Sequence, residues 1–289
     1  CKIPKFLHFG LGARPGQKKK QHVCPPRPIG PQTGLTTTIS PLVSSRDSID
    51  VGARLNHASW SGLEPIQTAA AELVAIPGVS SAFDRLGFRV GPRTDSWNGV
   101  ATAVELAEHL GFGAAVTVCL AAERPDEANL DETWLANRVA IAALAAAARA
   151  QAVVFLDTFI DFDRGYFVRH GLADRRGSLR RSGRVAALMH AILDGLPLNG
   201  EVVRRDLGHQ NRVIAYFSDD FALALFLSTK NTPLSLDTVI GATELLPARC
   251  ALIAVSLAAG TVMEVPANHA PELYLPGPIA VLPAGRGIP

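Results

Sequence analysis

The segment Val153–Gly183 joins an apolar strand pattern to a dense group of ionisable side chains. The run VVFLDTFIDFD leads directly into arginines and a histidine, with Asp157 inside the apolar run and Asp161 just after it. Parallel α/β folds place their binding and catalytic groups at the C-terminal ends of strands, so both carboxylates are candidate substrate ligands. Buried carboxylates also need partners, so a structural network of aspartates and arginines that fixes the loop is an equal alternative.

A second polar loop follows the strand-like residues 87–90 and contains Asp95, Trp97 and Asn98. An indole ring packs on the apolar face of a sugar, while amide and carboxylate oxygens bind its hydroxyl groups. This loop is therefore a candidate carbohydrate site. Asp95 can equally cap the helix that follows, and Asn98-Gly99 is equally typical of a turn.

Glu123 follows the apolar run AAVTVCLAA, at the predicted C-terminal end of another strand. A carboxylate there is a candidate nucleophile or general base, and the neighbouring Arg124 would favour its ionised form. The alternative is an exposed glutamate in an acidic loop.

Strands and helices in alternation are needed to position these loops. Strands are expected at 49–55, 87–90, 114–121 and 153–159, and helices at 64–76, 100–110, 132–150 and 181–193. This order predicts parallel βα units. Further short strands, separated by turn residues, are expected at 202–205, 213–217, 222–227, 251–257, 261–265 and 279–282.

The expected fold class is α/β, with parallel βα units that form a partial or complete (β/α)8-like barrel, followed by a small antiparallel β-sandwich domain. Three parts are predicted. Residues 1–50 form an irregular basic arm rich in Pro, Ser and Thr, 51–196 an α/β barrel-like domain, and 197–289 a β-rich accessory domain.

Composition limits the class of partner. Of the 289 residues, 48% are hydrophobic and 19% are charged, as in globular proteins. Residues 1–46 hold eight Lys/Arg and no Asp/Glu, which leaves a net charge of −6 on the remainder, with 20 basic and 26 acidic residues. Because no aromatic residues interleave with the lysine cluster of this arm, we expect a solvated tail and no nucleic-acid partner.

No metal or cofactor is expected, because the four cysteines lack C-x-x-C spacing and no nucleotide-binding motif appears. No apolar run reaches the ~20 residues of a membrane span, so no membrane partner is expected. No apolar segment follows the basic start, which favours a soluble, cytoplasmic location over secretion. The chain begins with Cys instead of Met and is expected to be a fragment, and its oligomeric state is left open.

The run VVFLDTFIDFD, the segment GYFVRHGLAD, a Gly/Arg turn and the helix after it carry a resemblance to a known family. In this order they resemble the end of a (β/α)8-barrel glycoside hydrolase with an appended β-domain, over about residues 80–289. The resemblance implies a carbohydrate substrate and hydrolysis by paired carboxylates at strand ends. It also places Arg169 and His170 in the wall of the substrate site.

In retaining members of such enzymes the nucleophile is a glutamate at the end of the seventh strand, a position that corresponds to Glu123. Glu64 is the candidate acid/base residue, although Leu63 stands where the family motif has asparagine, and a glutamate there also complements a helix dipole. A full barrel takes ~250 residues, more than the α/β pattern covers. A non-catalytic remnant or carbohydrate-binding protein is therefore an open alternative.

Arg169-His170-Gly171 also resembles the motif of histidine-type phosphatases. In that family the histidine accepts the phosphoryl group and the arginine binds it through two hydrogen bonds. There the motif opens the domain, whereas here it closes the α/β part. This is the second open alternative.

Overall fold

The computed structural model describes residues 63–120, 131–163, 168–169, 171–194, 200–208, 211–218, 221–228, 234–235, 251–265, 272–273 and 277–283. Within these ranges it describes the backbone alone at 63–66, 81–82, 162–163, 168–169, 208, 234–235 and 272–273. The predicted basic arm, the predicted strand at 49–55, Glu123 and His170 lie outside the described residues.

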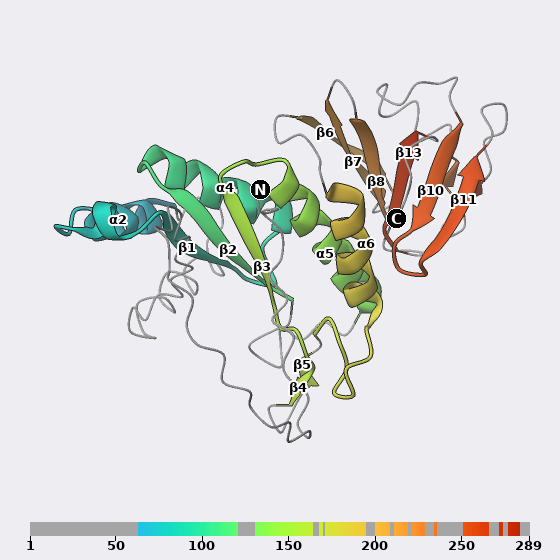
Figure 1. The fold of residues 1–289 in the computed structure, drawn as a ribbon, viewed down its shortest axis with the longest axis horizontal. Coiled ribbons are helices and arrows are strands. Elements are labelled where there is room, and N and C mark those ends of the chain that lie inside the picture. The colour runs from blue at the N-terminus through green and yellow to red at the C-terminus, as the bar shows by residue number, and fades with distance from the viewer. Residues whose placement is uncertain are drawn as a thin grey trace, which may run out of the picture.

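The α/β part is built on a parallel sheet of three strands in the order β1-β2-β3 (Figure 1). These are β1 (Arg85–Val90), β2 (Gly113–Cys119) and β3 (Ala152–Asp157). The crossover helices are α4 (Ser96–His109) and α5 (Glu132–Ala147). The predicted parallel βα units are confirmed.

The two faces of this sheet differ because side chains alternate along a strand. One face is apolar and buried against the helices, with Leu86, Phe88 and Val90 from β1 and corresponding valines from β2. The opposite face is half-buried and carries Arg89 and, in register with it, Thr117 and then Phe155. The face away from α4 and α5 is therefore the one that displays polar groups.

Two helices precede the sheet within the described residues. α2 (Leu63–Val74) and α3 (Val79–Ala82) lie beside the edge where the strands begin (Figure 1). Gly78 separates them with φ 89°, a left-handed conformation that glycine adopts without steric cost.

After β3 the chain makes a short antiparallel hairpin, β4 (Phe162–Asp163) with β5 (Val168–Arg169), and then enters α6 (Arg181–Leu193). α6 packs along α5. Gly183 lets α6 approach the segment between β5 and α6 closely, because a Cβ at this position would lie 2.2 Å from the carbonyl oxygen of Leu172.

The second part is a six-stranded antiparallel sheet in the order β11-β10-β13-β8-β7-β6 (Figure 1). Its strands are β6 (Glu201–Gly208), β7 (Asn211–Ser218), β8 (Phe221–Leu227), β10 (Leu252–Ser256), β11 (Thr261–Val265) and β13 (Ile279–Pro283). Each matches one of the six predicted strands. β9 (Leu234–Ser235) and β12 (Glu272–Leu273) form a separate pair.

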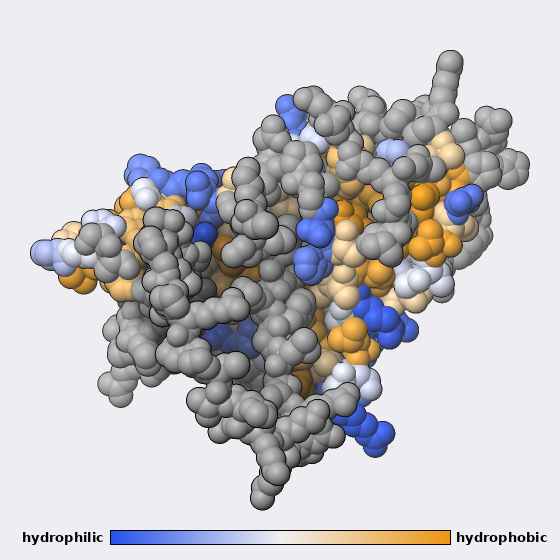
Figure 2. All heavy atoms as spheres, viewed as in Figure 1, coloured by the Kyte–Doolittle hydropathy of each residue, from blue (hydrophilic) through white to orange (hydrophobic). Residues whose placement is uncertain are grey.

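Both faces of this antiparallel sheet are buried along its central strands. One face, with Ile214 and Leu225, joins the same hydrophobic cluster as α5 and α6. The other face, with Val213 and Phe226, forms its own cluster. In Figure 2 hydrophilic residues gather over α4, whereas apolar residues gather over β10 and β11, where Val262 is exposed.

The α/β part followed by an antiparallel sheet is thus confirmed. A complete barrel, a sandwich and the division near residue 196 stay predictions. Among the described residues, no helix is both long and apolar enough to cross a membrane.

Candidate functional site

The C-terminal ends of the three parallel strands bring Asp157, Cys119 and Arg89 together. Asp157 ends β3 and is in register with Cys119, which ends β2. Arg89 of β1 donates from Nε to Sγ of Cys119 (2.8 Å) and from Nη2 to Oδ2 of Asp157 (3.4 Å). The hydroxyl of Thr158 donates to the other carboxylate oxygen of Asp157 (3.0 Å). The ion pair between Arg89 and Asp157 therefore links the C-terminal ends of β1 and β3 across β2.

The exposure of these side chains decides what they can contact. The side chain of Asp157 is 39% exposed and that of Arg89 is 28% exposed, whereas Cys119 is fully buried. A partly exposed carboxylate with an adjacent positive charge can accept hydrogen bonds from a hydroxyl ligand. The sequence indicated Asp157 as a candidate, but no sequence pattern singled out Arg89 as one of its partners.

Arg138, on α5, lies beneath the same edge and was not singled out from the sequence. Its side chain donates to the main-chain oxygens of Cys119 (2.9 Å), Thr94 (2.7 Å) and Gly91 (2.6 Å), and more weakly to that of Val90 (3.4 Å). Burial lowers the pKa of its guanidinium to about 10, against the opposing effects of Cys119 and Asp95. It is still protonated at neutral pH, so a buried cation joins the ends of β1 and β2.

Asp95 and Asn98 face the antiparallel sheet. Asp95 is the N-cap of α4, accepting from the amide of Asn98 (3.1 Å), and its other oxygen accepts from Arg212 of β7 (2.9 Å). The side-chain oxygen of Asn98 accepts from Arg204 of β6 (2.8 Å). The predicted capping role of Asp95 is present, and both side chains join the two parts of the fold.

Trp97 is buried, with 7% of its surface exposed. The guanidinium carbons of Arg149 and Arg204 lie 4.6 and 5.7 Å from the centroid of its ring. Burial lowers the pKa of Arg149, opposed in part by Glu105. These cation–π contacts occupy ring surface that a sugar would need, so they do not support the predicted role of Trp97 as a sugar platform.

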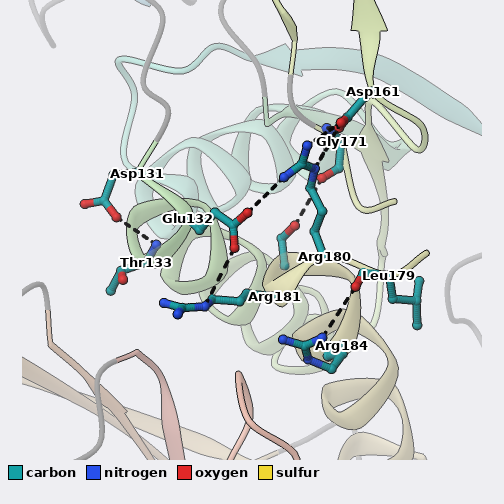
Figure 3. Close-up of polar contacts among 10 residues, drawn as sticks. Asp131, Glu132, Thr133, Asp161, Gly171, Leu179, Arg180, Arg181 and Arg184 are labelled. Atoms are coloured by element: carbon teal, nitrogen blue, oxygen red, sulfur yellow. Dashed lines mark hydrogen bonds and ion pairs between the residues drawn. The ribbon is translucent and has the colours of Figure 1, made fainter. Parts of the chain in front are cut away.

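Asp161 belongs to an ion-pair network that ties the loop after β3 to two helices (Figure 3). Its carboxylate accepts from the amide of Gly171 (2.9 Å) and from Nε and Nη2 of Arg180. Arg180 also pairs with Glu132 at the start of α5 (2.9 Å), which in turn lies 3.7 Å from Arg181. The hydrogen bond with Asp161 is the main cause that raises the pKa of Arg180. These contacts match the structural alternative for Asp161.

For the other sequence candidates the structure describes at most the backbone. Arg169 lies in β5, which pairs with β4 and not with the parallel sheet. Gly171 after it is needed for close packing, since a Cβ there would lie 2.7 Å from the carbonyl oxygen of Phe159. Glu64 lies in α2, beside the edge where the strands begin, and its side chain is outside the described part. No group of three metal-ligating side chains occurs in the part that the structure describes.

Comparisons with known proteins give a resemblance in structure alone. No protein-family model matches the chain, and no curated protein sequence matches it. Among solved structures, it resembles a glycoside hydrolase family 30 endoxylanase from Clostridium papyrosolvens (TM-score 0.43, 14% identity, 76% of this chain and 53% of that one). It also resembles a family 30 subfamily 8 xylanase from Clostridium acetobutylicum (0.41, 11%, 77% and 57%).

A third similar structure is a variant of AmyP in complex with maltotriose (TM-score 0.35, 13% identity, 80% of this chain and 69% of that one). The chain spans little more than half the length of the two xylanases. The resemblance is therefore to glycoside hydrolase barrels, at low identity and over part of their length.

Proposed function

We propose that this protein is glycoside hydrolase-like and acts on a carbohydrate at the C-terminal edge of the β1-β2-β3 sheet. The observation that carries the proposal is the Arg89–Asp157 pair, which lies on the polar face at the ends of adjacent parallel strands. Because the carboxylate is 39% exposed and has its counter-charge in place, it is suited to bind sugar hydroxyl groups.

The second carboxylate of the proposal is Glu123. It follows Cys119 by four residues, so its Cα lies within ~14 Å of that of Cys119 even in a fully extended chain. Cys119 is the register partner of Asp157, on a strand about 4.8 Å away. A sugar that binds to Asp157 is therefore within reach of the Glu123 carboxylate.

In this proposal Glu123 is the nucleophile, and Asp157 binds the sugar without taking part in the chemistry. Hydrolysis also needs a further carboxyl that donates a proton to the leaving oxygen. We do not assign that role to Glu64, because α2 lies beside the opposite edge of the sheet from Asp157.

The test compares three variants with the parent protein, using aryl glycosides for turnover and xylohexaose and maltohexaose for binding by calorimetry. Glu123→Gln is expected to abolish turnover while it leaves binding intact, and Asp157→Asn is expected to weaken binding. Asp84→Asn is the matched control, since this exposed residue lies at the start of β1.

If the parent binds an oligosaccharide but cleaves none, the non-catalytic carbohydrate-binding alternative replaces the hydrolase. If it neither binds nor cleaves any member of the panel, the proposal is wrong.

A further inference from the structure

Arg138 connects the loop after β1 to the last residue of β2. Its Nη1 and Nη2 atoms donate to the carbonyls of Thr94 and Gly91, in the loop after β1. Its Nε donates to the carbonyl of Cys119, the last residue of β2. One planar group therefore fixes the main chain of both strand ends.

The peptide between Cys119 and Leu120 is held on both sides. Its carbonyl accepts from Arg138, and its N–H donates to the carbonyl of Asp157. The side chain of Cys119 accepts from Arg89, which pairs with the Asp157 carboxylate. A shift of this peptide would therefore displace Arg89, a partner of Asp157, and the hydrogen bond to the Asp157 main chain.

The geometry requires a guanidinium. Three nitrogens of Arg138 donate at once to acceptors on two strand ends, and arginine holds its donors in a fixed planar fork. Lysine offers donors from a single nitrogen and cannot span these carbonyls. The side chain is 5% exposed, and within the described residues each of its hydrogen bonds ends on a main-chain oxygen, so its contacts are with the backbone that frames the site.

We propose that Arg138 is a positioning residue, which holds the ends of β1 and β2 in the arrangement that carbohydrate binding at Asp157 requires. It acts through the backbone and does not touch the ligand. This inference rests on the proposed function for the identity of the ligand, but not for the fixing of the two strand ends.

The test has two readouts, the first of which needs no ligand. Hydrogen exchange of peptides covering 90–98 and 117–120 is measured in the parent, Arg138→Lys, Arg138→Met and the control Arg184→Lys. Arg184 of α6 also donates to main-chain oxygens, those of Ala258 and Leu179, but neither acceptor lies in the two peptides. We expect faster exchange in both peptides for the two Arg138 variants and no change there for the control.

The second readout is affinity for xylohexaose, measured well below the unfolding temperature of each variant. Since a displaced Asp157 would lose charge-assisted hydrogen bonds to the ligand, we expect at least a tenfold loss of affinity for Arg138→Lys. A residue that contributed only to stability would lower the unfolding temperature and leave affinity unchanged.

Each outcome supports or refutes one part of the proposal. Unchanged exchange in Arg138→Lys would show that Arg138 does not fix the ends of β1 and β2, whatever the protein binds. Faster exchange with unchanged affinity overturns the link to binding. If the parent does not bind xylohexaose, the proposed role of Arg138 in binding that ligand is refuted. The exchange data then still decide whether Arg138 fixes the ends of β1 and β2.

Discussion

Replacement of Asp161 by asparagine tests the network that fixes the loop between β3 and α6. The carboxylate of Asp161 accepts from the amide of Gly171 and from Nε of Arg180, each at 2.9 Å, and it also pairs with Nη2 of Arg180. Asparagine has one oxygen, so its NH2 group must face either the guanidinium or the Gly171 amide (Figure 3). At least one charge-assisted hydrogen bond is lost.

The expected loss of stability depends on how deeply the pair of Asp161 and Arg180 is buried. The side chain of Asp161 is 5% exposed and that of Arg180 is 21% exposed, so solvent screens the pair weakly. Loss of one partner of a buried pair costs about 3–5 kcal/mol, but Arg180 keeps its contact with Glu132. We therefore expect Asp161→Asn to reduce the free energy of unfolding by about 2–4 kcal/mol.

The matched control is Glu132→Gln. Glu132 is 35% exposed, so its pair with Arg180 resembles a surface ion pair and should contribute about 0–1 kcal/mol. By thermal unfolding, Asp161→Asn should lower the midpoint by about 5–10 °C, and Glu132→Gln by far less. Limited trypsin digestion should also cut faster at the exposed Arg175 and Arg176 in Asp161→Asn. Equal midpoints for the two variants, or an Asp161→Asn shift as small as that of a surface pair, would refute this reasoning.

Two further predictions concern packing. Gly183→Ala is expected to destabilise the protein by more than ~2 kcal/mol, because the added Cβ would lie 2.2 Å from the carbonyl oxygen of Leu172 and force α6 away; an unchanged unfolding midpoint would contradict this. Tyr216→Phe leaves the Gly200 amide without the hydroxyl that now accepts its hydrogen bond at 3.1 Å, and should cost about 1–2 kcal/mol in urea unfolding at constant m-value. A Tyr216→Phe variant as stable as the parent would show that this bond contributes nothing.

Local sequence patterns predicted the secondary structure well. The helix expected at 181–193 is α6 with the same limits, and the six strands expected after residue 197 all occur. The apolar runs, the periodicity and the Gly/Pro breaks act within a few residues, so they can be read directly from the chain. The helix expected from residue 100 begins at Ser96 instead, because Asp95 caps it.

The partners of the candidate site residues could not be predicted in the same way. Arg89, which pairs with Asp157 from 68 residues earlier, was not indicated by any local pattern. Asp161 pairs with Arg180 among seven nearby arginines, and Asp95 with Arg212, 117 residues away. Spacing gives no information about such pairs, since they depend on sheet register and on how the antiparallel sheet packs against α4.

The sequence by itself determined the alternation of strands and helices, and it placed Asp157 at the C-terminal end of a buried strand. Tertiary structure alone decided that the Asp157 carboxylate stays partly exposed, whereas that of Asp161 is buried in an ion-pair network. It also buried Trp97 beneath Arg149 and Arg204, and placed Arg138 under two strand ends. The physical reason is that hydrophobic periodicity is a local property of the chain, whereas burial and ion pairing are fixed by contacts between elements distant in sequence.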